Sequence, residues 1–171
     1  MTFWEAVGSC FSKYAVFSGR ARRSEYWYFT LFNTLVSAVF TALARVTDGS
    51  RIVEILSGIF SLAVFLPGMA VAWRRMHDIG KSGVWTLAPT FLSITTTILA
   101  VFMFVVADTT HMDAASAMLI ALGVAAIATL VLLIVYIVWL VKDGQRGPNR
   151  YGPDPKAPTA AVAGERPPWE N

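Results

Sequence analysis

Long apolar stretches separated by short polar breaks dominate the chain between Tyr26 and Val141. Four of them are long enough to cross a hydrocarbon core of roughly 30 Å at about 1.5 Å per residue. They run over residues 26–44, 52–73, 84–107 and 114–141. Because an unpaired backbone amide in lipid costs several kcal/mol, each stretch is predicted to be a helix. The breaks at 45–51, 74–83 and 108–113 are short, so the pattern predicts an all-α membrane protein with a four-transmembrane-helix up-down bundle.

A different pattern precedes the first span. Thr2 and Glu5 have the spacing of a capping box, in which each side chain satisfies a backbone amide at the start of a helix. Apolar residues follow at steps of three and four, with polar residues on the opposite face, so residues 2–17 are predicted to form an amphipathic helix that Gly19 ends. Such a helix either lies in the headgroup region of a membrane or packs across the ends of the bundle. Both arrangements stay open, and residues 1–25 are taken as an interfacial helix with a basic segment.

Composition agrees with a membrane location. Hydrophobic residues make up 56% of the 171 residues and charged residues 15%, whereas soluble domains carry about 25% charged residues. The single cysteine, Cys10, excludes an intramolecular disulfide and a cysteine metal cluster. After the fourth span, residues 142–171 are rich in Pro and Gly and are predicted to form a cytoplasmic tail.

The lysines and arginines are distributed unequally between the two sides of the predicted bundle. One side carries Lys13, Arg20, Arg22, Arg23, Arg74, Arg75, Lys81, Lys142, Arg146, Arg150, Lys156 and Arg166, and the other carries only Arg45 and Arg51. Basic flanks stay on the cytoplasmic side of a bacterial inner membrane. Both termini are therefore expected in the cytoplasm, and the net charge of +3 is explained without nucleic-acid binding.

Candidate catalytic and metal-binding motifs are weak. Gly80-Lys81-Ser82 is like the end of a phosphate-binding loop, but the first glycine and the preceding strand of that motif are missing. His77 with Asp78, and His111 with Asp113, lack the additional ligands or nucleophile that a site requires. We therefore expect no enzyme activity, no cofactor and no metal.

Polar residues within the spans are few. Asn33 and the run Thr95–Thr97 are uncharged and are predicted to form hydrogen bonds between helices. Glu54 is the only acidic residue in a span and lies about one turn from its outer end. The absence of charges near the membrane centre argues against a proton-driven transporter.

Three polar stretches are richer than an orientation signal requires, because each mixes acids with bases. They are residues 19–27 (GRARRSEYW), 74–85 (RRMHDIGKSGVW) and 147–155 (GPNRYGPDP). In their order and spacing the chain resembles the family of bacterial inner-membrane proteins known as domain of unknown function 805, over roughly residues 10–155. The resemblance implies a helical bundle in the bacterial cytoplasmic membrane, and it implies no known activity.

Antiparallel helices bring these three stretches to one membrane face, so we predict that they meet in one polar cluster. Its predicted members are Arg20, Arg22, Arg23, Glu25, Arg74, Arg75, His77, Asp78, Lys81, Asn149, Arg150, Tyr151 and Asp154. Arg23 or Arg75 is expected to pair with Glu25 or Asp78, and residues 149–151 are expected to fold back over the middle loop.

The leading functional hypothesis is a non-enzymatic inner-membrane component whose cytoplasmic face binds anionic lipid headgroups or a partner protein. The alternative is a homo-oligomeric channel or small-solute transporter lined by Asn33 or the threonine run.

Overall fold

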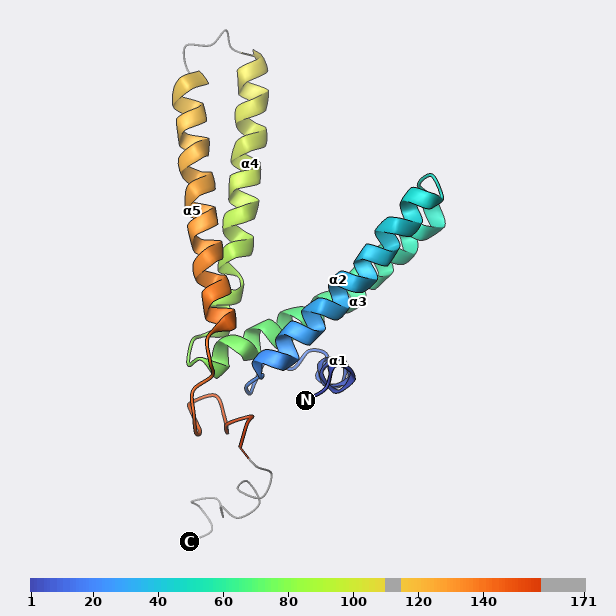
Figure 1. Ribbon diagram of the computed structural model, residues 1–171. Helices are drawn as coiled ribbons and strands as arrows, with labels where there is room; N and C mark the ends of the chain where they lie inside the picture. Colours follow the sequence, from blue (N-terminus) through green and yellow to red (C-terminus); the bar gives the residue numbers. More distant parts are fainter. Residues whose placement is uncertain (110–114, 158–171) are drawn as a thin grey trace. The chain divides into compact units, whose positions relative to one another are not determined.

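The structure is a computed structural model that describes residues 1–109 and 115–157. Its helical elements are α1 (Phe3–Ser12), α2 (Arg23–Val46), α3 (Arg51–Asp78), the short 3₁₀ helix η1 (Gly83–Thr86), α4 (Ala88–Thr109) and α5 (Ala115–Val141) (Figure 1). Within the described residues, four segments are long and apolar enough to cross a membrane: Arg23–Val46, Arg51–Asp78, Gly83–Phe102 and Ala121–Val141. The all-helical membrane fold is therefore confirmed.

Contacts divide the described chain into two compact units. The first unit contains residues 1–83 and 143–157, and the second contains residues 84–142. Each unit is built on one helical hairpin, α2–α3 in the first and α4–α5 in the second. The predicted up-down order of all four helices, and the predicted domains 26–141 and 142–171, stay predictions.

Helix α1 begins as the sequence indicates and ends earlier. The capping box between Thr2 and Glu5 is present, but the helix stops at Ser12, so the predicted extension to residue 17 is wrong. Tertiary contacts explain the difference. The Tyr14 hydroxyl donates to the Ala63 carbonyl of α3 at 2.8 Å, and the Phe17 ring packs edge-on against Trp73 at 5.6 Å between centroids. These contacts draw the chain out of helical geometry before Gly19.

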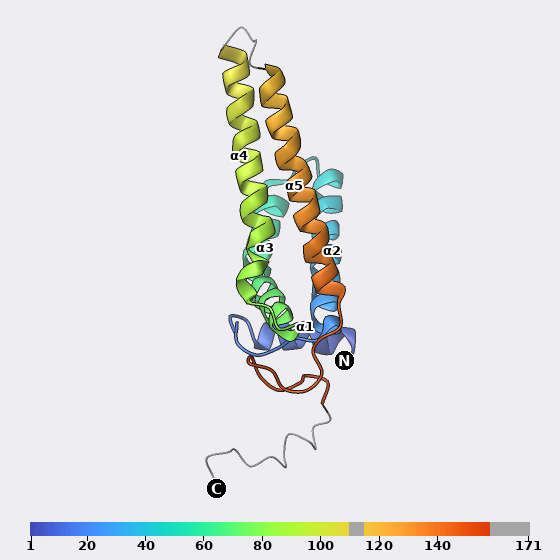
Figure 2. The same cartoon turned by 90° about the vertical axis from the view of Figure 1, so that its left-hand side faces the viewer.

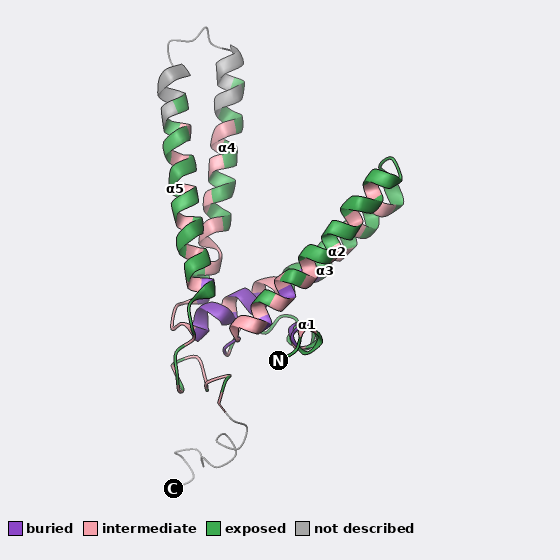
Figure 3. Cartoon of the chain, in the orientation of Figure 1, coloured by how far each residue is buried: buried purple, intermediate pink, exposed green. Residues whose placement is uncertain are grey.

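Helix α1 lies across the α2–α3 hairpin (Figures 1 and 2). Its buried residues Ala6, Val7 and Cys10 face the hairpin, and Cys10 joins Phe29 and Val71 in the core of the unit. Burial concentrates where α2 begins and α3 ends, whereas the rest of the hairpin exposes apolar side chains (Figure 3). That distribution is typical of helices surrounded by lipid along most of their length.

Helix α3 continues through Arg74–Asp78, which the sequence pattern assigned to a loop. The pattern was misleading because the charged residues in this range are buried against partners, which are described below. Their charge therefore does not indicate a solvent-exposed loop. The helix ends when Gly80 adopts a φ of +77°, and the amides of Gly80 and Lys81 donate to the carbonyls of His77 and Met76. The Gly80-Lys81-Ser82 sequence is therefore a helix terminator.

In the second unit, α5 contacts α4 through polar side chains and η1 through aromatic ones. The hydroxyls of Thr96 and Thr129 lie 3.0 Å apart, which confirms the predicted interhelical hydrogen bond for one member of the threonine run. Just before α4 begins, Trp85 of η1 packs edge-on against Trp139 of α5 at 5.5 Å between centroids. The candidate pair of His111 and Asp113 lies outside the described residues.

Candidate functional site

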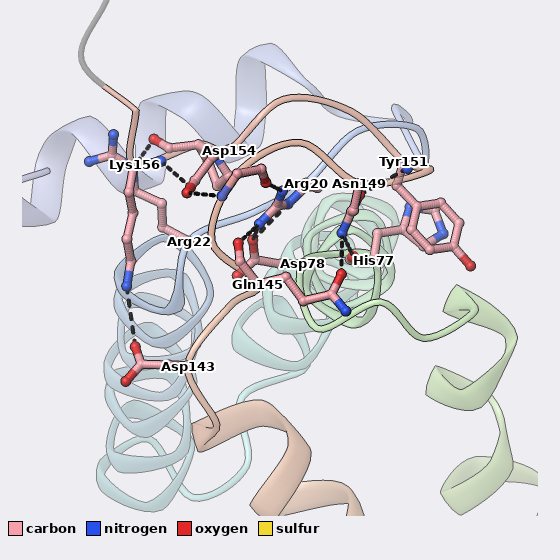
Figure 4. Close-up of polar contacts among 12 residues, drawn as sticks. Arg20, Arg22, His77, Asp78, Asp143, Gln145, Asn149, Tyr151, Asp154 and Lys156 are labelled. Atoms are coloured by element: carbon pink, nitrogen blue, oxygen red, sulfur yellow. Dashed lines mark hydrogen bonds and ion pairs between the residues drawn. The ribbon is translucent and has the colours of Figure 1, made fainter.

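Arg20 lies between the end of α3 and the segment after α5. Its Nε and Nη2 atoms approach Asp78 Oδ1 at 3.0 and 2.9 Å. Its Nη1 donates to the Gly147 carbonyl at 2.6 Å, and Nη2 also donates to the Gln145 carbonyl (Figure 4). Arg20 therefore holds residues 143–157, here named the return segment, against α3. With side chains only 1% and 2% exposed, the Arg20–Asp78 pair is shielded from water.

Asp78 accepts from a second arginine. Arg75 Nη1 donates to Asp78 Oδ2 at 2.6 Å, so both carboxylate oxygens are engaged. A Cβ atom on Gly144 would lie only 2.0 Å from Asp78 Oδ2. The return segment can approach the carboxylate this closely only because residue 144 is glycine.

A second buried pair joins α1, α2 and α3. Arg74 Nη1 donates to Glu25 Oε1 at 2.9 Å, and the Ser9 hydroxyl of α1 donates to the same oxygen at 3.2 Å. Among the described atoms, Nε and Nη2 of Arg74 have no hydrogen-bond acceptor. Cys10 lies in this environment, where burial first and the Glu25 charge second raise the pKa of its thiol to about 12. A thiol in that state is a poor nucleophile at neutral pH.

The return segment also covers His77. Asn149 Nδ2 donates to the His77 carbonyl at 3.0 Å, and the Tyr151 ring stacks on the His77 imidazole at 3.8 Å between centroids. His77 Nδ1 lies 3.1 Å from the Gly19 carbonyl. The Arg150 guanidinium lies over the Tyr151 ring and donates to the Gly80 carbonyl at 3.3 Å. Residues 149–151 do fold over the end of α3, as the sequence analysis predicted.

The outer part of the cluster is more exposed. Arg22 donates to the Pro155 carbonyl, and Arg23 pairs with Asp143 at 2.7 Å. Asp154 accepts from the backbone amides of Lys156 and Gly147, and these bonds lower the pKa of its carboxyl. A hydrogen bond from Lys156, with the charge of Arg23 adding to it, likewise lowers the pKa of Asp143.

The predicted pairings are correct in part. Arg75 pairs with Asp78 as expected. Glu25 pairs with Arg74 instead, and Arg23 forms its ion pair with Asp143. Lys81 lies just past the end of α3, where its amide donates to the Met76 carbonyl. Sequence reasoning missed Ser9, Asp143 and Gln145, because no motif marks them. For Asp143 and Gln145, the concentration of glycine and proline after the fourth span was the available signal.

A small polar pocket of about 280 Å³ opens beside the Arg20–Asp78 pair. It is lined by Asp78, Asp143, Gly144, Gln145, Arg146, Asp154 and Lys156. Across the part of the chain that the structure describes, His, Cys, Asp and Glu residues do not gather in threes that could hold a metal ion. With three carboxylates and two basic side chains around it, the pocket offers ionic contacts and no activated nucleophile.

Four apolar helices with a buried ionic cluster at one end of a hairpin define an integral membrane protein. Residues 14–153 match the family model described as "Protein of unknown function (DUF805)", and the chain belongs to this family. It is 35% identical over 148 residues to inner membrane protein YhaI of Escherichia coli K12, a match that covers 86% of this chain and 92% of YhaI. It is 30% identical over 151 residues to inner membrane protein YhaH of the same organism, covering 84% and 89% of the two chains. No solved structure matches.

These comparisons agree with the expected resemblance and identify a bacterial integral inner-membrane protein of unknown biochemical function.

Proposed function

We propose that this protein is a non-enzymatic component of the inner membrane whose polar cluster faces the cytoplasm and binds anionic lipid headgroups. The proposal concerns the end of the first unit where α2 begins, α3 ends and the return segment lies. Lipid phosphates lie at that level of a membrane, and they attract basic side chains whose charge the protein itself does not neutralise.

The observation that carries the proposal is an excess of basic over acidic side chains at this end of the first unit. The described basic residues there are Lys13, Arg20, Arg22, Arg23, Arg74, Arg75, Lys81, Arg146, Arg150 and Lys156. The described acidic residues there are Glu5, Glu25, Asp78, Asp143 and Asp154, half as many. Each of these carboxylates already accepts a hydrogen bond or ion pair from the chain itself. The remaining positive charge therefore favours an external anion.

Two of these basic residues fit the role best. Lys13 and Arg146 are exposed, and neither forms an ion pair with any residue that the structure describes. Arg146 also lines the polar pocket beside Asp78. A basic side chain near an anionic membrane surface contributes about 1 kcal/mol of binding.

The test compares lipid selection by the full-length protein and two charge-matched variants. Each protein is reconstituted into nanodiscs of mixed phosphatidylcholine and phosphatidylglycerol. Native mass spectrometry then counts the lipids that stay bound to the protein after its release from the nanodisc. Wild type should retain phosphatidylglycerol preferentially, and added salt should reduce the preference. The double variant Lys13→Gln with Arg146→Gln should lose most of it.

The control is Arg45→Gln with Arg51→Gln, which removes the same charge at the opposite end of the α2–α3 hairpin, where both side chains are exposed. This variant should retain the preference of wild type. An unchanged preference in the Lys13 and Arg146 variant would refute headgroup binding by the cluster and leave a partner protein as its ligand.

A further inference from the structure

Helix α1 has two exposed flanks of opposite chemistry. Successive helical residues are rotated by 100°, so Trp4 and Phe11 share one flank while Glu5 and Ser12 share the other. Trp4 is 73% exposed and Phe11 38% exposed, although both are large and aromatic. The Glu5 side chain on the polar flank is 63% exposed. Burial against α2 and α3 therefore accounts for a third face, and it leaves most of Trp4 and part of Phe11 exposed.

The two flanks lie at different levels along α2. On the polar side, Ser9 donates to Glu25, in the first turn of α2. On the aromatic side, the Phe11 ring packs edge-on against Phe29 and Phe32, at 5.7 and 6.1 Å between centroids. Four to seven residues further along a helix is about 6–10 Å. The aromatic flank is thus directed away from the ionic cluster and toward the apolar length of the hairpin.

The chain just after α1 is attached to the interior of a spanning segment. Tyr14 donates to the carbonyl of Ala63, four residues before Pro67. Proline has no amide hydrogen, so Pro67 cannot donate to this carbonyl as the residue of a regular helix would. The neighbouring Leu62 and Phe65 are 74% and 59% exposed, which indicates a lipid-facing level of α3. In lipid no water could replace the missing donor, and the Tyr14 hydroxyl supplies it.

From these contacts we infer that α1 is embedded in the lipid leaflet on the side of the ionic cluster, with its Trp4–Phe11 flank inserted toward the hydrocarbon and its Glu5–Ser12 flank toward water. The partner of this surface is the boundary between headgroups and acyl chains. Aromatic side chains favour that boundary, since it accommodates both an apolar ring and a polar edge. This insertion does not depend on lipid charge, which separates it from headgroup binding by the cluster.

The test measures depth with spin labels on the full-length protein in liposomes. In a Cys10→Ala background, single cysteines replace Trp4, Gly8 or Glu5; an added side chain at Gly8 meets nothing within 4 Å. Collision of each label with oxygen, which partitions into lipid, is compared with collision with a water-soluble nickel chelate. The ratio should be several-fold higher at position 4 than at position 5, with position 8 between them.

Wild-type protein provides a second measurement that needs no substitution. A lipid-soluble diazirine should label Trp4 and Phe11 on illumination, and a water-soluble one should label Glu5 and Ser12. Equal nickel accessibility at positions 4 and 5, or labelling of Trp4 by the aqueous reagent alone, would overturn the inference. Both measurements should give the same result in purely zwitterionic liposomes.

Discussion

At the scale of single residues, Asp78 joins three parts of the first unit. Its two carboxylate oxygens accept from Arg20, which precedes α2, and from Arg75, one turn earlier in α3, and its backbone carbonyl accepts from the Gln145 amide of the return segment. The three side chains are at most 2% exposed. Buried charges of this kind are tolerated only as a complete set, because each desolvated guanidinium needs its acceptor.

We predict that Asp78→Ala destabilises the protein by about 3–5 kcal/mol, because it leaves two arginines buried without their carboxylate. Thermal unfolding in detergent, monitored by circular dichroism, measures the effect. The matched control is Asp143→Ala, which removes a carboxylate with a side chain that is 67% exposed and has ion-pair partners in contact with solvent. It should change the unfolding midpoint little. Equal effects of the two substitutions would mean that the buried pairs do not stabilise the unit.

At the scale of elements, one contact that holds the chain after α1 against α3 crosses 49 residues of sequence. Pro67 leaves the Ala63 carbonyl without a donor from its own helix, and Tyr14 donates to it. The same hydrogen bond is one of the two tertiary contacts that follow the end of the helix at Ser12. One proline in α3 thereby contributes to where α1 stops and to how it is held.

A double-mutant cycle tests this dependence. Tyr14→Phe should cost about 1 kcal/mol of stability with Pro67 present, the net contribution of one hydrogen bond. In a Pro67→Ala background the new amide at position 67 can donate to Ala63, so the cost of Tyr14→Phe should fall markedly. Unfolding free energies of the four proteins in a mixed-detergent denaturant series provide the coupling.

Tyr28→Phe serves as the control for this cycle. The Tyr28 ring packs edge-on against Phe3 at 6.0 Å, and removing its hydroxyl should cost the same with or without Pro67. An additive cycle for Tyr14 and Pro67 would show that the two residues act independently.

At the scale of the whole molecule, the distribution of basic residues predicts that both chain ends lie in the cytoplasm. In a protein lacking Cys10, a membrane-impermeant thiol reagent added to intact cells should modify a cysteine placed at position 110 but not one placed at Ser82. Ser82 follows α3 on the side of the ionic cluster, and position 110 lies outside the described residues. Disrupted cells, in which both sides are accessible, provide the control. The reverse labelling pattern would invert the proposed orientation and with it the cytoplasmic site for lipid headgroups.

The amino-acid sequence by itself determined the four apolar helices, the capping box of α1 and the family. Helix formation in lipid depends on backbone hydrogen bonds within each segment, so local composition is sufficient to predict it. Short connections were also enough to predict that residues near Arg20, Asp78 and Asn149 would meet.

Only the tertiary structure decided which charges pair. Arg20 and Asp78 are 58 residues apart, Arg74 and Glu25 are 49 apart, and several arginines compete for each carboxylate. The choice depends on distances of a few ångströms between helices, which no spacing along the chain encodes. The same pairing keeps Arg74–Asp78 helical and buried where sequence alone indicated a solvated loop. Charge marks the end of a membrane helix only when it remains in water, and here the carboxylates of Glu25 and Asp78 take the place of water.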